Sequence, residues 1–236
     1  MADYAENNRF QLACLAYEQA VTLSREHLTM EELVSILFDT AYFLYINNAF
    51  RPSEKYYIEC LNCCYRLAAA TPEAYEPYVA MTINNLAILY SNTQRFSESE
   101  AMYQKVLEIY RRLATTYPEA YEPNVAMTLN NLANLYSDMQ RFTESEAMYQ
   151  EALEIYRHLA TAYPEVYEPY VAMTITYLAT LYRNTRRLSE SEAMFQEALE
   201  IRRRLATAYP EAYEPDVVIT LHNLANLYSD MQRLSE

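Results

Sequence analysis

The cysteines are the residues whose spacing comes closest to a site for chemistry. Cys60, Cys63 and Cys64 lie three and four residues apart, so on a helix they would share one face and could bind a metal ion, with Cys14 as a fourth ligand. A sequence repeat argues against this site, because it aligns Cys60 and Cys63 with apolar core positions: Val106, Ala152, Ile109 and Ile155. We expect no metal ion, buried thiols at Cys60 and Cys63, and exposed thiols at Cys64 and Cys14.

The histidines do not suggest a catalytic site. His27, His158 and His222 lie far apart in the repeat and have no nucleophile or carboxylate in phase with them to complete a catalytic triad. Glycine is absent from the sequence, which excludes phosphate-binding loops, dinucleotide fingerprints and the nucleophile elbow. The sequence therefore predicts a protein that is not an enzyme and that has no cofactor.

The charge of the chain limits its partners. Eighteen basic residues against 32 acidic ones give a net charge of −14, which repels nucleic acids and anionic membrane surfaces. We expect a protein or peptide partner that is basic or neutral rather than acidic. The first residues lack the pattern of a secretory signal, and no apolar run approaches the roughly 20 residues of a membrane span. These observations predict a cytoplasmic protein.

A long internal repeat organises the chain. Residues 95–140 recur at 187–232 with ten differences, and the blocks that begin at Ala49 and Arg141 follow the same pattern more loosely. The phase is marked by aromatic or leucine residues at steps of 40 and then four times 46, namely Phe10, Phe50, Phe96, Phe142, Leu188 and Leu234. A fixed period of this length predicts a stack of identical helical units, so we expect one elongated all-α domain.

Each unit contains signals for two helices. A capping box is expected to open the second helix of a unit at Ser97 with Glu100, and again in phase at Thr143 with Glu146 and Ser189 with Glu192. Pro118 and Pro123 bracket a segment that we interpret as a connection, followed by a first helix over about 125–138. In the divergent N-terminal part we expect helices over 11–26, 30–47 and 51–70. The in-phase tyrosines of the expected connections should pack between them: Tyr75, Tyr121, Tyr167 and Tyr213.

These residues resemble a known repeat family. The segment LNNLANLYSDMQRFTESEAMYQEALEI, residues 129–155, is similar to a tetratricopeptide repeat, particularly the longer kinesin-light-chain type with its N-N-L-A core. Alanine stands where the usual repeat has glycine, and the unit is longer than the usual repeat of about 34 residues. The resemblance implies a right-handed α-solenoid of antiparallel helix pairs with a 46-residue period. Its expected divisions are divergent units over 1–48, repeats over 49–94, 95–140, 141–186 and 187–232, and an incomplete unit from 233.

The resemblance also implies a binding face. In such arrays the first helices line a concave groove that binds a peptide segment of a partner, so we expect the chain to be a protein-interaction scaffold. The implied groove residues are Phe38, Tyr42, Tyr45, Asn84, Asn130, Asn134, Thr176, Thr180, Arg183, His222 and Asn226. Asparagine suits the role because its amide both donates and accepts hydrogen bonds. The alternative is that these asparagines bond to neighbouring helices or water.

Both ends of the sequence fall inside a repeat. Residues 1–9 resemble the tail of a first helix, and Leu234, Ser235 and Glu236 only open a second one. Stacked repeats usually need polar caps at their ends. One interpretation is a fragment of a longer array, such as the sensor or scaffold part of a larger signalling protein. The other is head-to-tail self-association into a structural assembly.

Overall fold

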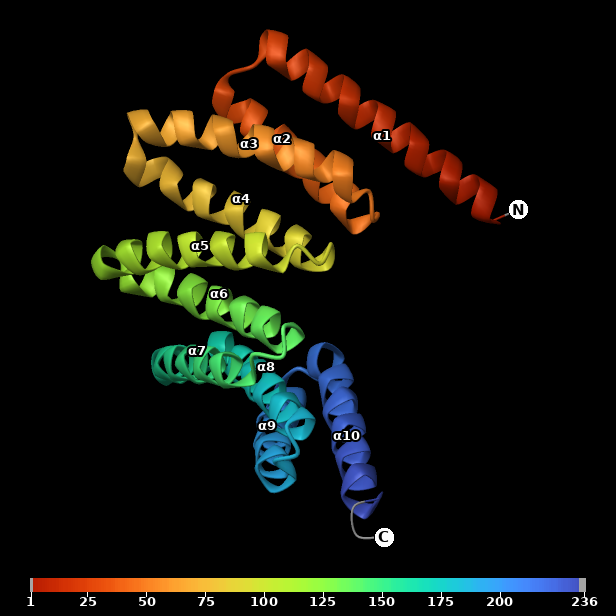
Figure 1. Ribbon diagram of the computed structural model, residues 1–236, viewed down its shortest axis with the longest axis vertical. Helices are drawn as coiled ribbons and strands as arrows, with labels where there is room; N and C mark the ends of the chain where they lie inside the picture. The colour runs from red at the N-terminus through yellow and green to blue at the C-terminus, as the bar shows by residue number, and fades with distance from the viewer. Residues whose placement is uncertain (1, 234–236) are drawn as a thin grey trace. The chain divides into compact units, whose positions relative to one another are not determined.

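The computed structural model describes residues 2–233, and this part of the chain is helical, with ten helices and no strand (Figure 1). It divides into two compact units, Met1–Tyr110 and Arg111–Glu236, and the division falls inside the helix α5 (Phe96–Thr116). The other helices of the first unit are α1 (Ala2–His27), α2 (Met30–Ile46), α3 (Phe50–Ala70) and α4 (Pro72–Asn92). The second unit contains α6 (Pro118–Asp138), α7 (Phe142–Ala162), α8 (Pro164–Asn184), α9 (Leu188–Ala208) and α10 (Pro210–Arg233).

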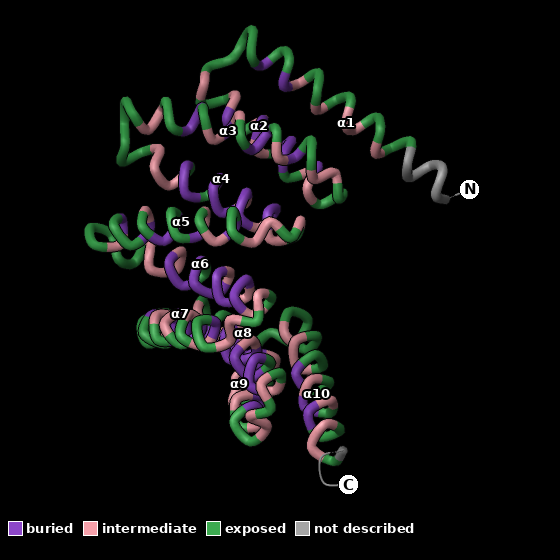
Figure 2. The backbone as a smooth tube through the Cα atoms, viewed as in Figure 1, coloured by how far each residue is buried: buried purple, intermediate pink, exposed green. Residues whose placement is uncertain are grey.

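Within each unit, helices that follow one another in sequence pack against each other. The buried residues of the first helices form continuous stripes along α4, α6 and α8 (Figure 2). A serine of the second helix lies against an alanine of the first: Ser145 Oγ donates to the Ala133 carbonyl oxygen, and Ser191 Oγ to that of Ala179, both at 2.8 Å. Because both side chains are small, the two helix backbones approach closely, and the hydroxyl satisfies its hydrogen bond inside the core.

The turns that link a first helix to its second helix share one conformation. Asn48, Gln94, Gln140 and Arg186 all have positive φ, the left-handed region in which glycine is usually found. The arginine after three of these residues stacks on a tyrosine in the last turn of the first helix, with Arg187 Cζ 3.9 Å from the Tyr182 ring centroid. The pairs Arg95–Tyr90 and Arg141–Tyr136 repeat this contact in phase. The cation–π contact holds the turn closed without a glycine.

The segment that the prolines bracket is helical, so our interpretation of it as a connection was wrong. Pro118 is the first residue of α6, where a missing backbone N–H costs nothing, and Pro123 lies inside the same helix. The Tyr121 amide donates to the Tyr117 carbonyl oxygen at 3.2 Å, which closes the first turn despite Pro123 two residues later. The in-phase tyrosines are accordingly helical residues, and Tyr121 and Tyr167 each pack edge-on against a tyrosine four residues earlier.

The expected capping boxes were also wrong. Helices α7 and α9 begin one residue before Thr143 and Ser189, their N-caps are Arg141 and Arg187, and neither cap has a side-chain hydrogen bond. α5 likewise begins one residue before Ser97. The glutamate of the expected box is used elsewhere: Glu146 accepts hydrogen bonds from Tyr182 Oη and Arg187 Nη1. A complete capping box does open α2, formed by Thr29 and Glu32.

The N-terminal part shows one agreement and two corrections. α2 and α3 match the expected ranges 30–47 and 51–70 to within one residue. α1 begins at Ala2, so the described residues before 10 continue this helix instead of forming the tail of a first helix. Cys64 is fully buried, not exposed, because it lies with Cys60 against Thr82 of α4. The hydrogen bond with Cys64 and burial raise the pKa of the Cys60 thiol, which keeps it protonated and unreactive.

Candidate functional site

Two asparagines expected in the groove hold helices of the second unit together. Asn130 is 2% exposed, and its Nδ2 donates to Thr174 Oγ1 of α8 at 2.8 Å. Asn134 Oδ1 accepts a hydrogen bond from Tyr149 Oη of α7 at 2.5 Å. These contacts with neighbouring helices are the alternative role that the sequence left open. They leave Asn130 little surface for a ligand.

The remaining expected residues of the second unit differ in accessibility. Thr176 is buried and bonds to the Ala172 carbonyl oxygen, whereas Thr180 is exposed. Arg183 Nε of α8 donates to Asp230 Oδ2 of α10 at 2.6 Å, which links two successive first helices. His222 is exposed and Asn226 is half-buried on α10. The first helices of the second unit therefore present a mostly polar face, and several of its side chains form hydrogen bonds with neighbouring helices.

The expected residues of the first unit are more apolar and more accessible. Phe38 is half-buried and meets the Tyr57 ring edge-on at 5.6 Å, which fixes its orientation. Tyr42 is 49% exposed. Tyr45 Oη accepts a hydrogen bond from Asn92 Nδ2 of α4 at 2.6 Å. Asn84, in contrast, is buried. α2 thus presents a row of aromatic rings, of which Phe38 is positioned by a contact with α3 and Tyr45 by a contact with α4.

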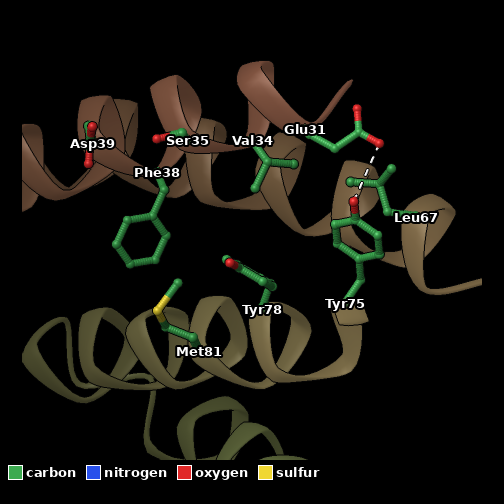
Figure 3. A pocket seen from close by; sticks show the side chains of 9 residues that line it. All are labelled: Glu31, Val34, Ser35, Phe38, Asp39, Leu67, Tyr75, Tyr78 and Met81. Atoms are coloured by element: carbon green, nitrogen blue, oxygen red, sulfur yellow. Dashed lines mark hydrogen bonds between the residues drawn. The ribbon is translucent and has the colours of Figure 1, made fainter. Parts of the chain in front are cut away.

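A pocket of about 330 Å³ opens between the first helices α2 and α4 beside Phe38. Figure 3 shows Phe38 and Met81 pointing toward each other from the two helices, with Tyr78 and Tyr75 following along α4. The complete lining is Glu31, Val34, Ser35, Phe38, Asp39, Leu67, Tyr75, Tyr78 and Met81. Tyr78 is 47% exposed and Met81 37% exposed, so the pocket offers accessible apolar surface to a ligand.

The charged groups of this pocket are all acidic. Glu31 and Asp39 are exposed residues of α2, and the Tyr75 hydroxyl donates to Glu31 Oε1 at 3.4 Å. Burial and the nearby Glu31 carboxylate raise the pKa of Tyr75, so its hydroxyl stays protonated as a donor. In the described part of the chain, neither carboxylate forms an ion pair with a basic side chain. The pocket therefore joins aromatic surface to two unneutralised negative charges.

The second unit has a pocket at the same place in its repeat. This pocket, of about 240 Å³, is lined by Pro123, Asn124, Met127, Tyr156, Val166, Tyr167 and Tyr170. Tyr167 and Tyr170 are in phase with Tyr75 and Tyr78, but Pro123 stands where the first unit has Glu31. The aromatic wall is thus a feature of the repeat, whereas the carboxylates belong to the α2–α4 pocket.

Most of the pocket was not predicted from the sequence. The expected binding residues include Phe38 but omit Glu31, Asp39, Tyr78 and Met81, and they place Tyr75 in a connection. A usable signal existed, because the segments 30–46 and 72–92 contain no lysine, arginine or histidine. A second signal was Glu31 itself, which stands at the repeat position where the later units have proline, Pro77 and Pro123.

The described residues hold neither a metal-binding cluster nor a membrane-spanning helix. No cluster of three or more histidine, cysteine or acidic side chains has the arrangement needed for a metal ion. None of the helices in this part of the chain combines the length and apolar character of a membrane span.

Successive antiparallel helix pairs with serine–alanine contacts define an α-solenoid repeat protein. The chain belongs to the tetratricopeptide repeat family. Models of this family match residues 79–114, 111–158 and 124–204, which together span more than half of the sequence. No curated protein matches the chain by sequence.

Solved structures share the fold. BtubC (BKLC) from P. vanneervenii is 24% identical with a TM-score of 0.70, over 94% of this chain and 83% of BtubC. RapI in its apo form is 16% identical with a TM-score of 0.69, over 97% of this chain and 63% of RapI, so this chain spans less than two thirds of it. A putative kinesin light chain from Podosopora anserina with nearly identical repeats is 15% identical with a TM-score of 0.58, over 88% of this chain and all (100%) of that one.

Proposed function

We propose that this chain is a protein-interaction scaffold that binds a peptide segment of a partner along the faces of its first helices. It acts as one repeat array, without catalysis, and its acidic surface favours a basic or neutral partner in the cytoplasm. The observation that carries the proposal is the accessible aromatic surface of α2 and of the α2–α4 pocket: Tyr42 of α2 is 49% exposed, and Tyr78, which lines the pocket, is 47% exposed. Exposed aromatic anchors beside a pocket are typical of surfaces that bind proteins.

Peptide display on the full chain tests this function. Random 12-residue peptides would be selected on the immobilised protein, and the affinity of the best peptide would be measured by fluorescence anisotropy. We expect Phe38→Ala together with Tyr42→Ala to weaken binding at least about tenfold, because loss of an aromatic anchor commonly costs more than about 1.4 kcal/mol. Circular dichroism would check that the variant stays helical.

A matched control comes from the second helix α3. Tyr65 is 47% exposed, close to the value for Tyr42, but it lies outside the proposed binding face. Tyr65→Ser should leave the affinity unchanged. Equal losses for Tyr65→Ser and for the α2 variant would show that the first helices are not the binding face.

Self-association is a second candidate function, favoured by a separate observation. Val218, Leu221 and Tyr228 of α10 are 65%, 42% and 45% exposed, whereas their in-phase counterparts Ala172, Ile175 and Tyr182 of α8 are buried. An apolar stripe of this kind marks an interaction surface. We propose that a helix from a second copy of the chain covers it.

A further inference from the structure

The α2–α4 pocket has the chemistry of a site for one cationic side chain, and this inference rests on the proposed peptide-binding function. The two helices that form it carry five acidic residues and no basic ones: Glu31, Glu32, Asp39, Glu73 and Glu76. A carboxylate stands at each end of the α2 side, Glu31 and Asp39, separated by about 12 Å along the helix. Between them lie the rings of Phe38, Tyr75 and Tyr78.

This order of groups matches a side chain with an apolar stem and a charged head. The methylene groups of such a side chain would pack against Val34, Leu67 and Met81, which form the apolar part of the lining. The cation would then contact an aromatic ring and a carboxylate together, and each contact strengthens as water is excluded. A neutral or acidic side chain would bring no positive charge to either carboxylate.

We propose that the α2–α4 pocket binds an arginine side chain of the partner peptide. The guanidinium group is planar, so it stacks on a tyrosine or phenylalanine ring while its edge donates two hydrogen bonds to one carboxylate. The lysine ammonium lacks both features. Glu31 is already positioned by the Tyr75 hydroxyl at 3.4 Å, and Phe38 by the Tyr57 ring at 5.6 Å.

The equivalent pocket of the second unit supplies an internal control. It keeps the two tyrosines, has a methionine, Met127, where the first pocket has Ser35, and has no charged residue in its lining. If the acidic residues select the ligand, arginine should bind beside Met81 and not beside Met127.

The test uses the full chain labelled with ¹³C at its methionine methyl groups, with Met81 and Met127 assigned by Met81→Leu and Met127→Leu. N-acetyl-arginine amide is titrated in, followed by N-acetyl-citrulline amide, its neutral isostere, and N-acetyl-lysine amide. We expect a saturable shift of the Met81 methyl resonance with arginine, and binding at least about tenfold weaker with citrulline, since a charge-assisted bond is lost. Glu31→Gln with Asp39→Asn should weaken arginine binding by a similar factor.

Four results would overturn the assignment: no response of Met81, equal binding of citrulline, equal binding of lysine, or an equal response of Met127. The citrulline comparison uses the unmodified protein, so it holds even if the double variant folds poorly. The peptides selected by display separate this inference from the proposed function. If the selected peptides bind but N-acetyl-arginine amide does not shift the Met81 methyl resonance, the pocket assignment fails and the scaffold function stands. If no peptide is selected, the scaffold function fails, and the titration still decides what the pocket binds.

Discussion

One aromatic position of the repeat shows how a single hydroxyl group affects the stability of the fold. Tyr57, Tyr103, Tyr149 and Phe195 occupy the same place in successive second helices, and all four are buried. The Tyr149 hydroxyl donates to Asn134, whereas the Tyr57 hydroxyl is buried without a hydrogen-bond partner among the described residues. Phe195 shows that the fold accepts a ring without the hydroxyl at this place. The Tyr57 hydroxyl therefore weakens the fold, because a buried polar atom has lost its bond to water.

This difference gives opposite expectations for the same substitution. Tyr57→Phe should raise the free energy of unfolding by about 0.5–2 kcal/mol, because it removes an unsatisfied polar group. Tyr149→Phe should lower it by about 1 kcal/mol, because it removes a hydrogen bond and leaves Asn134 Oδ1 without its donor. Urea denaturation followed by circular dichroism measures both changes. Two destabilised variants would mean that the Tyr57 hydroxyl has a partner in solution.

Residue positions were predicted best where the repeat keeps its residue types. The phase correctly placed Cys60 and Cys63 in the core, but it did not foresee that Arg202 and Asp216 replace the stacked pair Tyr156 and Tyr170. Arg202 is 7% exposed, and its Nη1 donates to the Asp216 carbonyl oxygen and to Thr220 Oγ1. Burial lowers the pKa of Arg202. Residues 202 and 216 lie on different helices, α9 and α10, so the residue types alone do not indicate that they meet.

At the scale of elements, the period predicted which helices exist, but it did not predict where the proline-led first helices begin. The apolar spacing and the repeat phase gave the helix pairs correctly. The start of α6 was missed, because proline at the first position of a helix looks like a break. The capping of α7 was missed, because Glu146 bonds to the next helix pair instead of to its own helix start. The α2–α4 pocket was missed for a similar reason, since its acidic residues and its tyrosines come from different helices.

The turn after α6 offers a test at this scale. Gln140 has φ of 61°, a conformation that costs a side-chain-bearing residue roughly 1–2 kcal/mol. Gln140→Gly should remove this cost at the expense of about 0.5–1 kcal/mol of chain entropy, so we expect a net stabilisation of up to about 1 kcal/mol. The urea midpoint measures it.

The neighbouring Met139 supplies the control for this turn. Its φ of −80° is favourable for any residue, so Met139→Gly should only add the entropic cost and destabilise the protein by about 0.5–1 kcal/mol. If both glycine variants were destabilised equally, the positive φ of Gln140 would carry no strain, and the arginine–tyrosine contact beside it would not be holding a costly turn.

At the scale of the whole molecule, the repeat itself indicates how a second copy would dock on α10. α1 occupies the place of a second helix, because Phe10 is in phase with Phe50, so α1 of one copy is the helix expected to cover the exposed stripe on α10 of another. Within the chain, Ser53 contacts Ala41. The equivalent repeat positions are Ala13 and Ala225, so Ala13 of one copy would contact Ala225 of the other. Likewise, Cys60 contacts Val34 within the chain, and the equivalent contact between copies would join Ala20 of one copy to Val218 of the other.

Two variants with opposite defects test this assembly. Leu221→Glu places a charge on the α10 stripe, where Leu221 is 42% exposed, and Ala13→Glu places one on the matching face of α1. We expect the unmodified chain to grow into open-ended oligomers as its concentration rises, because a heterologous contact does not close. Each variant alone should stay monomeric while remaining helical by circular dichroism. Sedimentation velocity over a concentration series measures these states.

The mixture of the two variants distinguishes head-to-tail contacts from other modes. Ala13→Glu keeps an intact α10, and Leu221→Glu keeps an intact α1, so an equimolar mixture should form dimers and stop there. Symmetric pairing of two α10 helices would instead give dimers of the unmodified chain and of Ala13→Glu alone, with no gain on mixing. An unmodified chain that stays monomeric at high concentration would rule out both modes, and the apolar stripe would then be available to a different protein.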